Sequence, residues 1–339
     1  MRSITVTFAI LMFSPLALGH HSAAAFFDRS RIVEVEGTVS DVYWRNPHVS
    51  LTLDVVNDAG EIEAWELEAG TTNTLMRRGF TADSVSIGDR VTAAGAPSRR
   101  GEPAIFVSNV LLPNGEEYII ADREEPLRWT SASTADEMQV SVDELPGTGI
   151  FKVWGFRALY SLRNPLVLTP AAEAAIEAFN PRTDDPGLRC IPPGMPNAIL
   201  NPYPMELIDG GDRIVQRIEE WDARRVIYLN EADVPSNLSP SHLGVSVGRW
   251  EGETLVVETT QIAFYLLDAI GTPMSESASL VERYTLSEDG ASLRYEVIVT
   301  DPVNLAEPAI WDNTWAYRPG IEVSPFECTL RETVSPVYQ

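Results

Sequence analysis

Histidine, cysteine and lysine are scarce in this chain of 339 residues, which has four histidines, two cysteines and one lysine. Cys190 and Cys328 are too few and too far apart in sequence for a structural zinc site. In an oxidising compartment they would pair and close a large loop, and otherwise they would be two buried thiols. We expect the disulfide, because the other features of the chain point to secretion.

Several signatures of common function classes are also missing. The sequence has no phosphate-binding loop, no HExxH and no CxxC. Residues 244–248 match the letters of a nucleophile elbow, but they precede an expected antiparallel strand instead of opening a helix. After residue 19 no apolar run reaches the roughly 20 residues that a membrane-spanning helix needs. A formal net charge of −24 opposes binding to nucleic acids and to anionic lipid surfaces.

Residues 1–19 have the pattern of a secretory signal peptide. Arg2 precedes an apolar run, and Ala17 and Gly19 supply small residues at the −3 and −1 positions of a cleavage site. Cleavage there would make His20 the first residue of the mature protein. The sequence therefore predicts a secreted, periplasmic protein with no membrane segment after signal cleavage.

Residues 20–121 are predicted to form a first domain of short strands. Period-two alternation marks strands, and a glycine C-cap ends a short helix between the third and the fourth strand. The expected strands are 32–43, 48–56, 62–69, 87–93 and 104–112, with the helix at 71–79. Five strands in this order are typical of an OB-like barrel.

Residues 122–168 are predicted to be a linker and junction segment, with the aromatic stretch 151–160 packing across the domain junction. Residues 169–339 form the second domain, which opens with a helix capped by Thr169. Eight strands follow between turn signals: 205–209, 214–219, 224–229, 245–250, 254–260, 279–286, 293–301 and 311–318. This spacing favours a larger antiparallel β-barrel with a lipocalin-like layout.

Two blocks of motifs resemble a widespread family of secreted bacterial proteins of unknown function. The first block comprises His20-His21-Ser22, Gly37-Thr38-Val39, Trp44-x-Asn46-Pro47-His48 and Gly88-Asp89-x-Val91-Thr92. The second comprises residues 190–196 and the motif G-x-S-x-G-R-W-E-G-x-T-L-V-V at 244–257. The resemblance implies secretion and a two-block layout but no known reaction. Val245 stands where the second block is expected to carry a histidine, which weakens histidine chemistry there.

The histidines suggest a copper site at the mature amino terminus. The α-amine and ring of His20 supply two nitrogens, and His21 or His48 would supply another. Copper(II) favours nitrogen ligands in a square-planar arrangement. The alternative is that His20 and His21 form a solvated terminus and that His48 bonds a backbone carbonyl in its turn.

Carboxylates on the expected inner face of the second barrel form a second candidate site. Glu282 shares a strand face with Leu280 and Tyr284, and Asp301 ends the face that carries Tyr295 and Val297. A carboxylate in an apolar lumen is costly unless it is paired. Such a group would have a shifted pKa and could bind or transform a ligand.

Two further residues complete this candidate site. Arg249 shares a face with Val245 and Val247 and is predicted to point into the lumen, while His242 is a candidate base near the barrel mouth. The alternatives are an arginine–carboxylate pair that only fixes the barrel, a register shifted by one residue, and a surface loop histidine.

The sequence thus favours a small-ligand-binding protein with an apolar ligand in the second barrel and copper at His20. An isomerase, cyclase or hydrolase that uses Glu282, Asp301 and Arg249 is the competing class, together with a copper oxidase-type site at His20. A protein-interaction module without a small ligand is the third class. The ligand, the reaction and the oligomeric state do not follow from the sequence.

Overall fold

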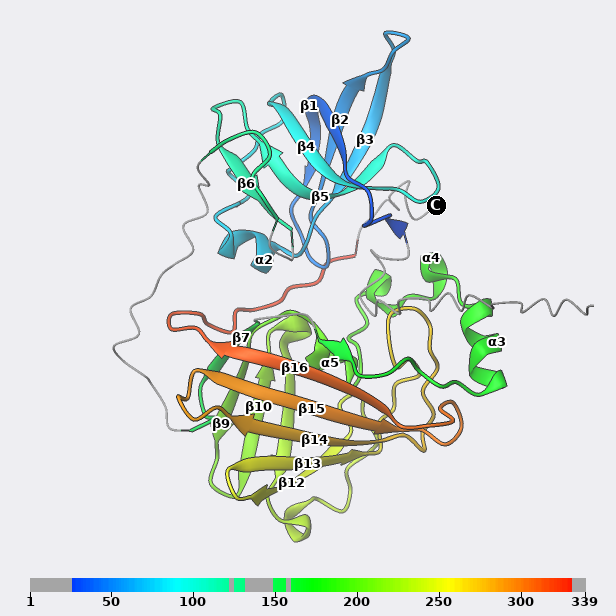
Figure 1. Ribbon diagram of the computed structural model, residues 1–339, viewed down its shortest axis with the longest axis vertical. Helices are drawn as coiled ribbons and strands as arrows, with labels where there is room; N and C mark the ends of the chain where they lie inside the picture. Colours follow the sequence, from blue (N-terminus) through cyan, green and yellow to red (C-terminus); the bar gives the residue numbers. More distant parts are fainter. Residues whose placement is uncertain (1–25, 122–124, 132–148, 157–159, 331–339) are drawn as a thin grey trace, which may run out of the picture.

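The computed structural model describes residues 26–121, 125–131, 149–156 and 160–330. The protein is mainly β, with a closed five-stranded barrel followed by a larger, closed nine-stranded barrel. Figure 1 shows the two barrels one above the other, with α3 and α4 to one side of the junction between them. The predicted fold class is confirmed.

The first barrel is built from β1–β5 and has α2 between its third and fourth strands. The elements are β1 (Val33–Tyr43), β2 (Ser50–Val56), β3 (Ile62–Glu68), α2 (Thr72–Arg77), β4 (Arg90–Pro97), β5 (Ala104–Leu111) and β6 (Glu117–Ile119). Antiparallel pairing runs in the order β3-β2-β1-β4-β5, and a parallel pairing of β3 with β5 closes the barrel. Thr71 caps α2, because its hydroxyl accepts from the Thr74 amide.

Nine strands close the second barrel. In chain order they are β7 (Val153–Phe156), β9 (Met205–Asp209), β10 (Arg213–Ile218), β11 (Ala223–Tyr228), β12 (Val245–Glu251), β13 (Thr254–Thr260), β14 (Ser279–Leu286), β15 (Ser292–Thr300) and β16 (Ala309–Tyr317). Pairing of β15 with β16 closes the ring, and β8 (Ser161–Leu162) extends it beyond β16. All eight strands expected in this domain are present, each within two residues of its predicted ends.

Two features of this barrel differ from the sequence prediction. Residues 153–156, which were expected in a stretch packed across the domain junction, form β7 and pair with both β9 and β16. The strand is only four residues long, too short for a periodic pattern to reveal it. In addition, β11 and β12 are parallel, because the connection 229–244 crosses from one end of the barrel to the other.

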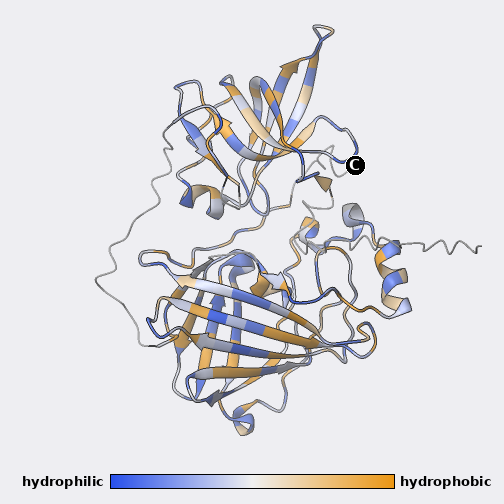
Figure 2. Ribbon diagram, in the orientation of Figure 1, coloured by the Kyte–Doolittle hydropathy of each residue, from blue (hydrophilic) through white to orange (hydrophobic). Residues whose placement is uncertain are grey.

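Each barrel has its own apolar core. Figure 2 shows hydrophobic and hydrophilic residues alternating along the strands of the second barrel. The inner face of β15 carries Leu293, Tyr295, Val297 and Val299, all fully buried. The core of the first barrel includes Val39, Leu53, Leu67 and Ile105, among others. Alternation with a period of two therefore places the apolar side chains inside, as the sequence indicates.

Short helices cover the junction side of the second barrel. They are α3 (Pro170–Ala178), α4 (Pro181–Asp184), η1 (Pro186–Arg189), α5 (Asn197–Leu200) and η2 (Glu220–Asp222), whereas η3 (Glu231–Asp233) lies at the opposite end of the barrel (Figure 1). Thr169 caps α3 through a hydrogen bond from the Ala172 amide, as expected. In the part of the chain that the structure describes, none of the helices has the length and apolar character to cross a bilayer.

The chain after β16 returns to the first barrel and is fixed there. Figure 1 shows this segment running between the two barrels. The side-chain amide of Asn73 donates to the carbonyl of Pro325 (3.0 Å), and the backbone amide of Thr329 donates to the carbonyl of Asn46 (3.1 Å). Cys328 forms a disulfide with Cys190, 138 residues earlier in the chain. The predicted disulfide is confirmed and is compatible with an oxidising compartment.

Removing this disulfide is expected to lower the stability of the protein substantially. A loop of this length is worth about 5 kcal/mol in the chain-entropy account, and measured losses for native disulfides are about 2–5 kcal/mol. Urea unfolding of Cys190→Ser and Cys328→Ser, each compared with the wild type in reduced and oxidised form, measures the change. A loss well below about 1 kcal/mol would show that the remaining contacts hold the segment without the bond.

Candidate functional site

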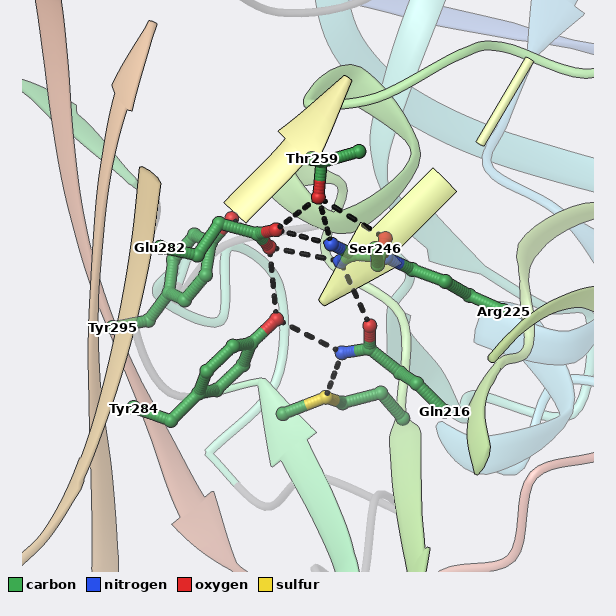
Figure 3. A network of polar contacts seen from close by, with 8 residues as sticks. Gln216, Arg225, Ser246, Thr259, Glu282, Tyr284 and Tyr295 are labelled. Carbon is green, nitrogen blue, oxygen red and sulfur yellow. Dashed lines mark hydrogen bonds and ion pairs between the residues drawn. The ribbon is translucent and has the colours of Figure 1, made fainter. Parts of the chain in front are cut away.

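A buried ion pair crosses the lumen of the second barrel. Arg225 on β11 and Glu282 on β14 form a two-pronged salt bridge, and their side chains are 1% and 0% exposed. Figure 3 shows the pair surrounded by the polar side chains of Gln216, Ser246 and Thr259 and by two tyrosines. The predicted inward position of Glu282 is therefore correct.

Every donor of the Arg225 guanidinium is used. Its Nε donates to Ser246 Oγ (2.7 Å), and one terminal nitrogen donates to Gln216 (3.3 Å) and to Glu282 (2.9 Å). The other terminal nitrogen donates to Thr259 Oγ1 and to Glu282. A guanidinium has five N–H groups, so the set is complete.

The carboxylate of Glu282 is equally saturated. Besides Arg225 it accepts hydrogen bonds from Thr259 (3.2 Å), Tyr284 (3.0 Å) and Tyr295 (3.0 Å). Burial, followed by the charge of Glu282, raises the pKa of both tyrosines well above the usual value. With no donor or acceptor left over, the network fixes the barrel and leaves no hydrogen-bonding capacity for a substrate.

The other residues of the predicted lumen site lie elsewhere. The prediction that Arg249 faces the lumen is wrong: its side chain is 53% exposed and pairs with Glu251 and Glu258 on the outer surface. The inner face of β12 carries Ser246 and Gly248 instead, so the apolar Val247 points outward. A rule that apolar residues face inward therefore gives the wrong register for this strand.

Asp301 and His242 each form hydrogen bonds to loop residues. Asp301 is 2% exposed and accepts hydrogen bonds from Ser275, Val303 and Asn304. Burial raises the pKa of Asp301, but these hydrogen bonds outweigh it and lower the pKa below its usual value. His242 is half-buried, and its Nδ1 contacts the carbonyl of Pro192 (2.9 Å). The four predicted catalytic residues are therefore not brought together.

Breaking the ion pair from one side should be strongly destabilising, because it leaves an uncompensated buried charge. Arg225→Gln or Glu282→Gln is expected to cost about 3–5 kcal/mol of unfolding free energy. The matched control is Arg249→Gln, which breaks an exposed pair and should cost about 0–1 kcal/mol. Urea unfolding measures the loss of unfolding free energy for each variant. Equal losses for the buried pair and for the exposed Arg249 pair would contradict this account.

A second group of titratable side chains lies where the first barrel faces the second. His48, just before β2, contacts the buried carboxylate of Glu68 on β3 through Nδ1. The imidazole is 26% exposed, and within the described residues no hydrogen-bond partner contacts its Nε2. The turn before it is fixed by Asn46, whose side-chain oxygen accepts from the Thr72 amide at the start of α2 (2.9 Å).

The first described residues of the chain lie beside His48. The Asp28 amide donates to the carbonyl of Pro97 at the end of β4 (2.8 Å), and the ring of Phe27 lies 5.7 Å from the ring of Phe106 on β5. The ring of His48 lies 6.3 Å from the same Phe106 ring. Arg29 stacks over Phe106 as well, at 5.1 Å. The amino-terminal segment is thus held against the ring on which His48 packs.

Carboxylates of the second domain also act on His48. Burial lowers the pKa of His48, but the charge and hydrogen bond of Glu68 and the carboxylates of Asp185 and Glu220 raise it above its usual value overall. Burial raises the pKa of Glu220 to about 8, against a hydrogen bond from Asn201 and the charge of His48. His48 and Glu220 come from different barrels, so their interaction reports on the junction.

Replacing Glu220 by glutamine should stabilise the protein at alkaline pH. The folded-state pKa of about 8 exceeds the ordinary glutamate pKa of 4.5, so the folded protein retains a proton that the unfolded chain releases between these two pH values. Stability therefore falls as the pH rises through this window. Glu220→Gln removes this pH-dependent loss of stability. The Tm of the variant should therefore equal that of the wild type near pH 4 and exceed it most above pH about 8.

Thermal unfolding followed by circular dichroism across this pH range measures the effect. The exposed Glu253 provides the matched control, since Glu253→Gln should leave the pH profile unchanged. A constant difference between Glu220→Gln and the wild type at every pH would show that Glu220 is ionised in the folded protein.

The remaining predicted metal ligands, His20 and His21, lie outside the described residues. In the described part of the chain, no group of three or more histidine, cysteine or acidic side chains is arranged to hold a metal ion. His48 is therefore the one candidate ligand that the structure places. Glu68, its partner, was not predicted, because Glu66 and Glu68 are both buried in a strand that offers no clean alternation.

Comparison with known families gives one match. The family of unknown function DUF6152 matches residues 9–105. The match covers most of the first barrel and none of the second. No curated protein sequence matches the chain. The match is to a family of unknown function and assigns no activity to the chain.

Proposed function

We propose that this protein is secreted and binds copper through the mature amino terminus and His48. The observation that carries the proposal is the contact between His48 Nδ1 and the buried Glu68. Metal-binding histidines usually donate one ring N–H to a carboxylate, which orients the ring and makes the other nitrogen a better ligand. Glu68 would play that part, and Nε2 of His48 would face the metal.

The chain length from His20 to His48 supports the same site. Phe26 follows His20 by six positions, and six residue steps of extended chain span about 20 Å at most. The segment 26–28 is held beside Phe106, on which His48 packs. The amine and ring of a mature His20 could then join His48 as the nitrogen ligands that copper(II) prefers.

The charge of the junction favours a cation. Glu68 and Asp185 act on the His48 ring, Glu220 adds its charge only once the pH rises above about 8, and the whole chain is acidic. Nearby carboxylates lower the cost of placing a divalent cation at His48. The disulfide supports a secreted location, where a copper ion at an exposed terminus would be accessible.

Copper affinity of the mature protein tests the proposal. One Cu(II) should bind tightly to protein that begins at His20, and the paramagnetic resonance spectrum should show nitrogen ligands. An extra residue before His20 and the change His48→Ala should each abolish tight binding, while Glu68→Gln should weaken it by about 10–100-fold.

His242→Ala is the matched control, since this half-buried histidine lies in the second barrel domain and its loss should leave copper affinity unchanged. Equal, weak binding by all variants would overturn the proposal. Loss of binding on extension of the terminus, but not in His48→Ala, would also overturn it, because the terminal histidine alone would then form the site.

The remaining functional predictions stay open. An enzymatic site built from Glu282, Asp301, Arg249 and His242 would need these residues together, and the described contacts hold them apart. An apolar ligand in the second barrel remains a prediction, and a separate observation on β16 bears on it.

A further inference from the structure

Two buried N–H donors on β16 have no hydrogen-bond partner among the residues that the structure describes. They are Nδ2 of Asn313 and Nε1 of Trp315, and the residues are 4% and 1% exposed. The side-chain oxygen of Asn313 accepts from the Thr314 amide (2.7 Å), so only the donor end of this amide is unpaired. Buried donors without a partner are rare in folded proteins, and two on one strand call for an explanation.

Both donors lie on the inner face of the second barrel. Buried and half-buried residues alternate along β16, and Asn313 and Trp315 share the buried face with Trp311. Asn313 lies opposite Tyr295 on β15, and Trp315 lies opposite Leu293. The rings of Trp315 and Tyr295 are 5.3 Å apart. The surroundings of the two donors are thus aromatic and aliphatic.

In the same lumen, the acceptors of the polar network around Glu282 are already used by other donors. Glu282 already accepts five hydrogen bonds, and Tyr295 directs its hydroxyl to that carboxylate (3.0 Å). Arg225 has no donor left over for an anion. The lumen therefore combines a complete, charge-balanced network with two unused neutral donors.

We propose that Asn313 and Trp315 bind a hydrogen-bond acceptor on a small, mainly apolar ligand inside the second barrel. The acceptor is a neutral carbonyl, as in a ketone, ester or amide. An anionic carboxylate does not fit, because a buried charge needs a cationic or multiply donating partner and the guanidinium here is fully used. The site is independent of the copper proposal and gives the predicted apolar ligand a defined polar contact.

Three probes of equal chain length test this assignment: undecane, 2-undecanone and undecanoate. Binding is measured by displacement of the neutral dye Nile red from the full mature chain in the presence of EDTA, so that copper plays no part. The ketone should bind roughly tenfold tighter than the alkane, the gain expected when buried donors acquire a partner. Undecanoate should bind more weakly than the ketone.

Two variants locate the effect. Asn313→Leu and Trp315→Phe each remove one donor and keep an apolar side chain of similar shape, so each should reduce the preference for the ketone. Thr314→Val is the matched control, since Thr314 lies on the other face of the same strand and should keep the full preference.

A direct readout covers the case in which a variant fails to fold. In the wild type, the indole N–H proton of Trp315 should shift on addition of 2-undecanone and not of undecane. The proposal is overturned if the three probes bind alike or not at all, or if the indole proton of the wild type does not move. A buried water held by both donors would then be the remaining occupant.

Discussion

The ion pair between Arg225 and Glu282 spans a seam of the second barrel that has little backbone pairing. β11 and β12 are parallel and share only two residue pairs, whereas β10 and β11 share six and β12 and β13 share seven. Arg225 crosses this seam with hydrogen bonds to side chains on β12, β13 and β14. Side-chain bonds thus replace the missing ladder bonds. A buried charge can do so only because every donor and acceptor around it is matched.

The junction between the barrels depends on the turn from β10 to β11. Trp221 and Asp222 adopt left-handed backbone conformations there, with φ of 60° and 50°, which non-glycine residues adopt only when their surroundings impose it. The ring of Trp221 packs on Phe326 of the carboxy-terminal segment, at 5.2 Å. Glu219 pairs with Arg77 of the first barrel, while Glu220 lies near His48. One irregular turn therefore contacts both the returning segment and the first barrel, and the disulfide at Cys328 holds that segment in place.

The sequence predicted the strands well because their inner faces are mostly apolar, as on β14 and β15. It failed where polar residues face inward. On β12 the buried residues are Ser246 and Gly248, so alternation pointed Arg249 the wrong way. On β10, however, Ile214 and Ile218 flank Gln216 on the inner face, and Gln216 lies opposite Arg225 across the hairpin. Reading the hairpin register outward from the turn would have identified Arg225 as buried. Glu68 carried no comparable signal, because its contact with His48 depends on the pairing of β2 with β3 and on the turn fixed by Asn46.

Charge separates the two ligand classes that this molecule could accommodate. In the described part of the second barrel, the buried guanidinium of Arg225 is neutralised by the carboxylate of Glu282. The unpaired groups, on Asn313 and Trp315, are neutral N–H donors. A neutral acceptor on a ligand would pair with them at a lower desolvation cost than a charged one. At the junction the balance is reversed, since the carboxylates of Glu68 and Asp185 act on a single imidazole, whose Nε2 is the metal ligand in the proposed copper site. Carboxylates near His48 favour a cation at the junction. In the lumen the carboxylate of Glu282 is already paired with Arg225 and offers a cation nothing. The unpaired hydrogen-bonding groups and the charges of each site thus indicate which ligand class we propose for it, although both domains are β-barrels.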